Sequence, residues 1–269
     1  MLRLPAVAGY FYPAKPEALT SLVEKCLKDE QTSSKTKARA CLVPHAGLVY
    51  SGAVAGAVFG RLALPKKILL LGVRHHPHGA EQAILSEGAF RTPLGDVPID
   101  TTLALELRKA CPALEENAVA HKQEHSLEVE LPFLQTLDSG FSFVPIAIGT
   151  HDFEALSATG AGIADVLGRY PEEVLVVTSS DMNHYEDEVA TRTKDQKAIE
   201  QLLKLDARGL LHACRQHRIT MCGMGPAIVM LTALQKLGAT SAQLVRHATS
   251  GDINGDRSSV VGYAGLIFN

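Results

Sequence analysis

The sequence predicts an α/β fold, a single three-layer αβα domain with a mostly parallel central sheet. Two observations lead to this prediction. Short apolar runs, which are typical of buried strands, alternate along all 269 residues with segments whose apolar residues recur at helical spacing. No linker, repeat, low-complexity tract or shift in composition divides the chain, so we expect one domain over residues 1–269.

The first predicted elements are two helices and two strands. Ala18–Leu27 carries apolar residues at helical spacing. Arg39–Val43 is a short apolar run that ends at a proline, and Lys67–Gly72 is a continuous apolar run of the length of a buried parallel strand. Between these strands, the Ala-, Gly- and Val-rich segment Ser51–Leu64 predicts a helix that packs closely on the sheet, with Ser51 as its N-cap.

The middle of the chain predicts a segment of short strands and turns, followed by two helices. Gly and Pro residues interrupt Ile84–Ile99, which favours short strands and turns. Thr101–Ala110 and Ser126–Leu137 are expected to be helical, the second with a kink at Pro132.

The second half of the chain repeats the alternation. Phe141–Ile148 and Glu173–Thr178 are predicted strands, and the second is the clearest buried strand of the sequence. Further helices are expected at Phe153–Leu167, Val189–Leu203, Ala207–His217 and Pro226–Lys236. The chain is expected to end with two antiparallel strands that close the sheet, Leu244–Ala248 and Val260–Ile267.

Composition excludes several classes of function. Lys and Arg together number 26 against 29 Asp and Glu, which gives a formal charge of −3. The chain therefore has no excess of basic residues of the kind that binds nucleic acid. No apolar run reaches the ~18 residues of a membrane span, and Met1–Pro5 lacks the apolar core of a signal peptide. Five scattered cysteines are no disulfide framework. We therefore expect a cytoplasmic protein that binds neither nucleic acid nor membrane.

Three predicted strands run directly into histidines. If the strands are parallel, the residues that follow them collect at one edge of the sheet, where ligands bind in such folds. Histidine and aspartate at that edge suit a metal ion or proton transfer, whereas an isolated histidine is more often an ordinary loop residue. The residues are His45 after the first strand, His75, His76 and His78 after the second, and Asp181 and His184 after the third.

Three other segments carry candidate residues. Cys222 lies in a Gly-rich turn before a predicted helix, where a thiolate is favoured and can bind a soft metal, or where a small structural residue fits. His125 is either a general acid or base, or part of a helix cap formed by Ser126. The polar segment Ser250–Arg257 lacks the ligand spacing of an EF-hand and is either a substrate-facing loop or a hairpin turn.

Familiar catalytic and binding motifs are missing. The sequence has no Gly-x-Gly-x-x-Gly after a strand, no Walker A motif, no Gly-x-Ser-x-Gly, no His-Glu-x-x-His and no paired Cys-x-x-Cys. The strand-end histidines therefore remain the main indication of function.

The ordered set of motifs resembles the Memo family, whose prokaryotic members are called AmmeMemoRadiSam system protein B. Each motif is weak alone, but their order along nearly the whole chain is specific. The motifs are Val7-Ala8-Gly9-Tyr10-Phe11-Tyr12-Pro13, Pro44–Gly52, the His75-His76 pair, Arg91-Thr92-Pro93-Leu94-Gly95, Glu124–Glu128, Ser179-Ser180-Asp181 with His184, and Cys222-Gly223.

The resemblance implies a fold similar to that of class III extradiol ring-cleaving dioxygenases, which are non-haem iron enzymes. It also implies a metal-binding set of His45, His76 and Cys222, with Asp181 and His184 in the same pocket. His125 would correspond to a catalytic acid/base histidine of those dioxygenases, completing the expected site.

One departure from the dioxygenase pattern concerns the metal. Those enzymes hold iron with two histidines and a carboxylate, and here Cys222 takes the place of the carboxylate. A thiolate favours softer metals such as copper(I) or zinc, so ring cleavage does not follow from the fold. We expect iron or copper first, with zinc as the third candidate.

Three functional hypotheses follow. The first is a metal-dependent oxidoreductase in which His125 and His184 move protons and Asp181 holds one imidazole in its tautomer. The second is a metal- or ligand-binding protein without turnover, with a small molecule or peptide as its ligand. It would have a signalling or accessory role beside the radical SAM and AMMECR-type partners that the family name implies. The third is zinc-assisted hydrolysis.

Overall fold

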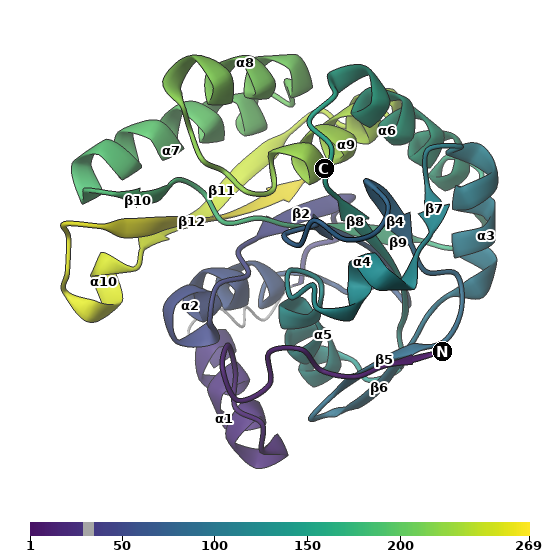
Figure 1. The fold of residues 1–269 in the computed structure, drawn as a ribbon, viewed down its shortest axis with the longest axis horizontal. Coiled ribbons are helices and arrows are strands. Elements are labelled where there is room, and N and C mark those ends of the chain that lie inside the picture. The colour runs from purple at the N-terminus through teal and green to yellow at the C-terminus, as the bar shows by residue number, and fades with distance from the viewer. Residues whose placement is uncertain (29–34) are drawn as a thin grey trace.

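The computed structural model describes residues 1–28 and 35–269, and within them a central sheet carries helices on both faces (Figure 1). The sheet has nine strands. Their spatial order is β10 (His184–Glu186), β12 (Val260–Phe268), β2 (Ala40–Val43), β9 (Val174–Ser179), β3 (Lys67–Val73), β8 (Ser142–Ile148), β4 (Gln82–Ile84) and β7 (Glu115–Glu116), with β11 (Ala242–Thr249) also paired to β12.

The centre of the sheet is parallel, as predicted. The strands β2, β9, β3 and β8 pair in parallel, and antiparallel pairs flank them at β12 and β4. These four strands are almost continuously buried, which explains why each reads as an uninterrupted apolar run. The terminal strands β11 and β12 are antiparallel neighbours, which confirms that expectation.

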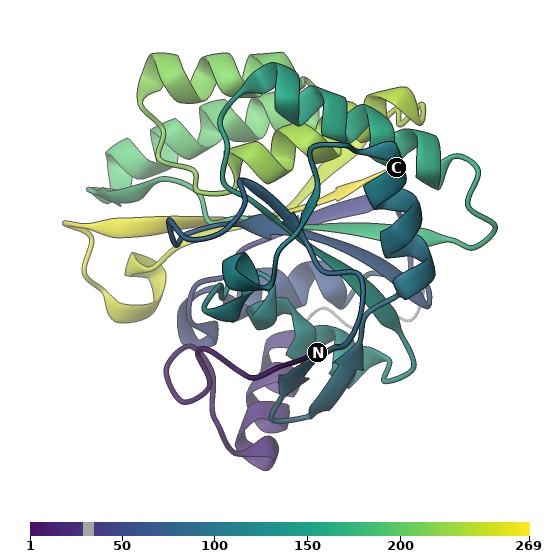
Figure 2. The same cartoon turned by 45° about the vertical axis from the view of Figure 1, so that its right-hand side comes forward.

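Helices cover the two faces of the sheet in two separate layers (Figure 2). Alternate strand residues point to opposite layers, so Leu69 and Leu71 belong to one apolar cluster and Ile68 and Leu70 to the other. The first layer contains α3 (Thr101–Ala110), α6 (Phe153–Leu167), α7 (Glu188–Leu203), α8 (Ala207–His217) and α9 (Met224–Lys236). The second contains α1 (Pro16–Leu27), α2 (Leu48–Phe59) and α5 (Leu131–Leu137). The three-layer αβα prediction is thus confirmed.

Several small elements were not individually predicted. A second, three-stranded sheet pairs the N-terminal residues with the segment Ile84–Ile99, which was expected to form short strands and turns. It contains β1 (Leu2–Arg3), β5 (Ala89–Thr92) and β6 (Gly95–Pro98). Further small elements include the short strands β7 and β10, the helix α4 (Ala118–Lys122), the 3-10 helix η2 (Glu128–Glu130) and α10 (Gly251–Asn254), which lies in the segment expected to be a polar loop.

The predicted helix Ser126–Leu137 is divided in the structure. Ser126 precedes the helical region, and its hydroxyl bonds both the N–H and the carbonyl of Val73 at the end of β3. The helix α5 begins at Leu131, so Pro132 occupies its first turn, where proline costs no backbone hydrogen bond. The expected kink and the Ser126 cap were therefore wrong.

The start of α2 also differs from the prediction. The helix begins at Leu48 with Gly47 as its N-cap, and Ser51 lies inside the first turn. The Ser51 hydroxyl donates to the carbonyl of Ala46, which gives this buried polar group a partner without capping the helix.

A buried carboxylate fastens the N-terminal segment to the domain. Glu128 accepts hydrogen bonds from the backbone N–H of Ala6 and Val7, at 2.8 and 3.1 Å, and from the hydroxyl of Tyr12. It also pairs with the guanidinium of Arg3, which lies over the ring of Phe90. Both members of the ion pair are almost fully buried, so every acceptor of Glu128 must be satisfied within the protein.

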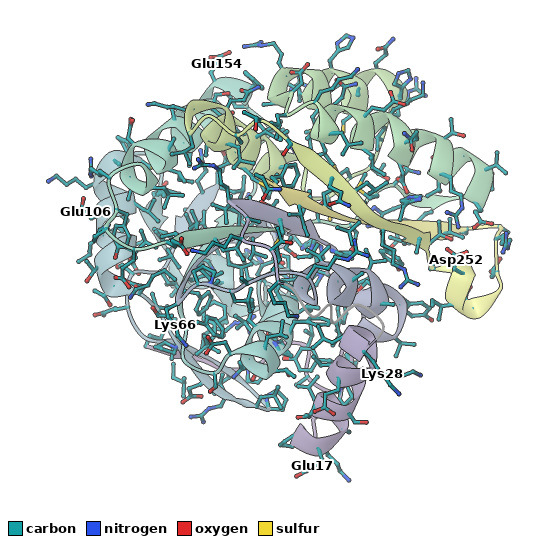
Figure 3. The ribbon with its side chains drawn as sticks, turned by 180° about the vertical axis from the view of Figure 1, so that it is seen from behind. Glu17, Lys28, Lys66, Glu106, Glu154 and Asp252 are labelled. Atoms are coloured by element: carbon teal, nitrogen blue, oxygen red, sulfur yellow. The ribbon has the colours of Figure 1, made fainter. Side chains whose placement is uncertain are left out.

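Other charged side chains form ion pairs on the surface. Viewed from behind, Glu106, Glu154 and Asp252 lie at the periphery of the molecule (Figure 3). Each pairs with an arginine, at 2.8, 3.2 and 2.8 Å. Exposed pairs of this kind contribute little to stability. None of the helices in the described part of the chain combines the length and apolar character that a membrane crossing requires.

The buried position of Glu128 predicts a large effect of its neutralisation. The substitution Glu128→Gln leaves the Arg3 charge without its partner, and we expect the free energy of unfolding to fall by about 3 kcal/mol. Urea titration of the full chain measures this value. Glu173→Gln removes the exposed partner of Lys37 and serves as the control, for which we expect little change. Equal stability of Glu128→Gln and the control would contradict this assignment.

Candidate metal-binding site

The ends of three parallel strands bring the candidate residues together. His45 follows β2, His75 follows β3 and Asp181 follows β9, and these strands are direct neighbours. They therefore emerge at one edge of the sheet, where ligands bind in this class of fold. A cavity of about 620 Å³ lies there. We call it the histidine cavity, and His45, His75, His125, Asp181, His184 and Cys222 line it.

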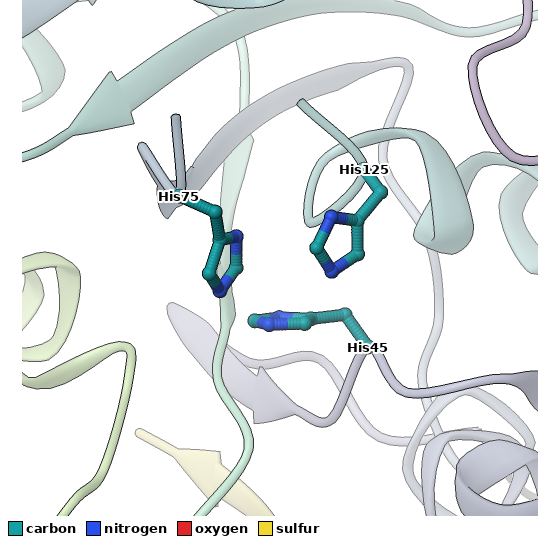
Figure 4. Close-up of side chains that lie close together, drawn as sticks. All are labelled: His45, His75 and His125. Carbon is teal, nitrogen blue, oxygen red and sulfur yellow. The ribbon is translucent and has the colours of Figure 1, made fainter. Parts of the chain in front are cut away.

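Three histidines form its most compact cluster. His45, His75 and His125 each offer one ring nitrogen, and these nitrogens lie within 4.8 Å of one another. The ring centroids are 5.2 Å apart for His45 and His75, 5.4 Å for His45 and His125, and 4.5 Å for His75 and His125. The three rings converge from different parts of the chain (Figure 4). This arrangement can hold a metal ion.

Glu124 fixes the orientation of His75. Its carboxylate accepts the backbone N–H of His75 at 2.6 Å and contacts ring atom Nδ1 at 2.9 Å. Burial alone would raise the pKa of Glu124, but the hydrogen bond and charge of His75 outweigh it and hold the pKa well below its usual range. The carboxylate thus keeps the proton of His75 on Nδ1 and leaves Nε2 free as a donor atom.

The close packing of the Ser126 and Leu127 side chains on Gly72 places His125. A Cβ on Gly72 would lie 2.6 Å from the hydroxyl of Ser126, so only glycine lets the Ser126 loop close onto the end of β3. In that position Nδ1 of His125 lies 3.7 Å from Glu124, and the ring packs edge-on against Phe11 with centroids 4.7 Å apart.

His45 is held by a chain of buried hydrogen bonds. Its Nδ1 lies 2.7 Å from the hydroxyl of Ser179, which donates to Glu130 at 2.8 Å. Since the hydroxyl proton points to the carboxyl group, Nδ1 of His45 carries a proton and Nε2 is free. Burial, helped by the nearby charge of His75, lowers the pKa of His45 to about 3. Burial also raises the pKa of Glu130 well above its ordinary value.

Cys222 lies beside the cluster. Its Sγ is 3.4 Å from Nε2 of His45, and it accepts the backbone N–H of Asp181 at 3.3 Å. A Cβ on Gly223 would collide with Ser180, which explains why a glycine follows the cysteine. Burial, together with the charge of Asp181, raises the pKa of the Cys222 thiol. The thiol is therefore protonated at neutral pH, and a metal bound there would displace its proton.

Two further polar residues, His184 and Asp181, complete the wall of the histidine cavity. The backbone N–H and Nδ1 of His184 donate to Thr220, at 2.8 Å to its hydroxyl and 3.0 Å to its carbonyl. Nε2 of His184 is left for the cavity. Asp181 accepts the backbone N–H groups of His45 and Ala46, at 2.9 and 3.3 Å. Burial raises its pKa, and the charge of His184 opposes that rise.

The structure groups the candidate residues differently from the set that the sequence suggested. Of the His75-His76 pair, His75 rather than the expected His76 joins the cluster, because Glu124 binds both its amide and its ring. His125, expected as an acid or base, is the third member of the cluster. Asp181 was expected to hold an imidazole, but its carboxylate bonds backbone amides and Ser179 contacts the ring of His45.

The acidic residues that support the histidines were not predicted from the sequence. Glu130 was not singled out, and Glu124 and Ser179 appeared only as members of longer motifs. A signal was present in Leu127–Leu131, where two glutamates interrupt an apolar run. Charged residues in such a run need buried partners, and here the partners are the N-terminal segment and Ser179.

Comparison with known proteins places the whole chain in one group. A family model described as Memo-like protein matches residues 3–267. A MEMO1 family protein of Methanopyrus kandleri is 38% identical over 280 residues, covering 100% of this chain and 99% of the relative. Those of Sulfolobus acidocaldarius and Methanocaldococcus jannaschii are 38% and 37% identical, each over 283 residues, and cover 100% and 99% of this chain and 99% and 98% of the relatives.

A solved structure shares the fold. An uncharacterized protein of Escherichia coli K12 superposes with a TM-score of 0.55 and 13% identity, covering 86% of this chain and 100% of that one. At this level of identity the likeness concerns the fold alone.

Because the rings of His45 and His125 are largely buried, we predict that both resist protonation. Burial, with the charge of His45 adding to it, lowers the pKa of His125 to about 4, and that of His45 is about 3, against 6.5 in the unfolded chain. The unfolded chain therefore binds these protons first, so their contribution to stability is present above pH 6.5 and is lost as the pH falls toward 3.

Nuclear magnetic resonance of metal-free protein, with assignment from His45→Gln and His125→Gln, measures these titrations. We expect the ring-proton shifts of both residues to stay at their neutral values down to pH 5. A midpoint near pH 6.5 for either ring would show that it is solvated and not held as described.

Proposed function

Because this chain belongs to the Memo-like protein family, we propose that it is a metal-binding protein in which His45, His75 and His125 hold one iron or copper ion. The convergence of three ring nitrogens within 4.8 Å carries this proposal. Imidazole nitrogens are suitable ligands for iron, copper and zinc, so zinc is the third candidate.

The surroundings of the rings fit such an ion. In metal sites the ligating histidine usually donates its other ring N–H to a carboxylate or similar acceptor. Glu124 does this for His75, and Ser179, backed by Glu130, does it for His45. The low pKa of His45 keeps its ring neutral, as a metal ligand must be.

The cavity beside the cluster has room for a reactant. A bound iron or copper ion would supply electron transfer and an open coordination position. His184 presents Nε2 to the same space, where it can take or give a proton. Asp181 holds the His45 loop by its backbone amides. These groups support an oxidoreductase, with Cys222 as an additional ligand from the side of His45.

Metal binding without turnover is the second candidate. The Cys222 thiol favours it, because sulfur beside His45 suits copper(I) or zinc better than an oxygen-activating iron centre. Oxygen uptake by anaerobically purified, iron-loaded protein with catechol-like substrates separates the two candidates. Uptake supports the oxidoreductase, and full metal occupancy without uptake supports the binding protein.

The cluster predicts which histidines determine metal affinity. His45→Ala, His75→Ala and His125→Ala each remove one nitrogen ligand, and we expect each to weaken binding about 100-fold or more. Anaerobic calorimetry with iron(II) and zinc(II), and chelator competition with copper(I), measure the affinities. His76→Ala and His78→Ala are the matched controls, for which we expect unchanged binding. A larger loss for His76→Ala than for His75→Ala would assign the ligand to His76 and contradict the proposed set.

A further inference from the structure

A second and larger cavity, of about 1000 Å³, adjoins the histidine cluster. Phe11, His75 and His125 line both cavities, so the two spaces share a wall at the proposed metal centre. The other wall is formed by the first seven residues of the chain and by α4. We call this space the N-terminal cavity. It lies within the size range of sites that enclose small molecules.

Exposed apolar side chains gather around this cavity. Met1, Leu2 and Leu4 are 57%, 40% and 61% exposed, and Val119 on α4 is 60% exposed. All four belong to its lining. Single exposed apolar residues are common, but several on one concave surface mark a binding site. Since the same surface carries His75 and His125, an apolar ligand here would lie beside reactive groups.

The apolar wall is preformed. Leu2 and Arg3 pair with Ala89 and Phe90 of β5, and Glu128 binds the backbone N–H groups of Ala6 and Val7. The N-terminal segment is therefore fixed on both sides of Leu4. A ligand would not have to order this wall on binding, which lowers the entropy cost of its capture.

The charges around the cavity favour an anion. Among the described residues that line it, none is acidic, while Lys122 is exposed at its edge. The guanidinium of Arg3 is already paired with Glu128 and contributes no free charge. A metal ion held by His75 and His125 would add positive charge on the inner side. A cationic ligand would find no partner there, whereas a carboxylate would.

We propose that the N-terminal cavity binds an anionic amphiphile, a small molecule whose apolar body lies on Leu4 and Val119 and whose carboxylate-type head points toward His75 and His125. The binding site stands on its own observations. Only the assignment of this molecule as the reactant, with its head at the metal, rests on the proposed function.

The binding of decanoate, used below its micelle concentration, tests the site. We expect calorimetry to show saturable binding, with Leu4→Asp and Val119→Asp each weakening it at least tenfold, because both place a carboxylate on the apolar wall. Both side chains are exposed, so folding should be unaffected. Val189→Asp, a change at an even more exposed apolar residue of α7, should bind decanoate like the unaltered protein. Decylamine, with the same chain and opposite charge, should bind much more weakly.

The outcomes distinguish this site from the metal centre. Decanoate binding that Leu4→Asp weakens, in protein that binds no metal, would support the site and refute the proposed function. Metal binding without decanoate binding would overturn the site. Binding of phosphatidylglycerol vesicles without binding of monomeric decanoate would also overturn it and make the apolar wall a membrane contact.

Orientation is measured on protein loaded with less than one equivalent of copper(II). Paramagnetic broadening should affect the protons beside the decanoate carboxylate more than the terminal methyl group. Stronger broadening of the methyl group would overturn the proposed direction of the head.

Discussion

The site depends on one short segment, residues 124–130, whose buried polar side chains bind three other parts of the molecule: the end of β3, the N-terminal segment and the end of β9. Glu124 holds His75, and Ser126 bonds the end of β3. Glu128 fastens the N-terminal segment, and Glu130 reaches Ser179 at the end of β9. Burying these groups is costly unless each has a partner, so the segment has few alternative positions. His125, inside it, is placed by the same constraint.

This arrangement joins the fold to the chemistry of the rings. The parallel sheet brings His45 and His75 to one edge, but it does not decide which ring nitrogen faces the cavity. The hydrogen bonds of Ser179 and Glu124 make that choice by occupying Nδ1. The same network that orients the free ring nitrogens toward the histidine cavity also holds the wall of the N-terminal cavity, so the two spaces are built by shared residues.

Much of the fold could be predicted from the sequence, because the central strands are continuous apolar runs and the apolar residues of the helices recur at helical spacing. The strand-end position of His45 and His75 followed from the same pattern. The choice of His75 over His76 could not be predicted, because it depends on Glu124, which lies 49 residues away in sequence. The division of Ser126–Leu137 was missed for a similar reason, since Ser126 bonds Val73 rather than its own helix.

X-ray absorption at the metal edge of protein loaded with one equivalent of iron(II) or copper(I) tests the central claim most directly. We expect a spectrum dominated by three imidazole ligands, with at most one sulfur ligand from Cys222. A spectrum of oxygen ligands without imidazole scattering would contradict it, because the three rings would then not share an ion.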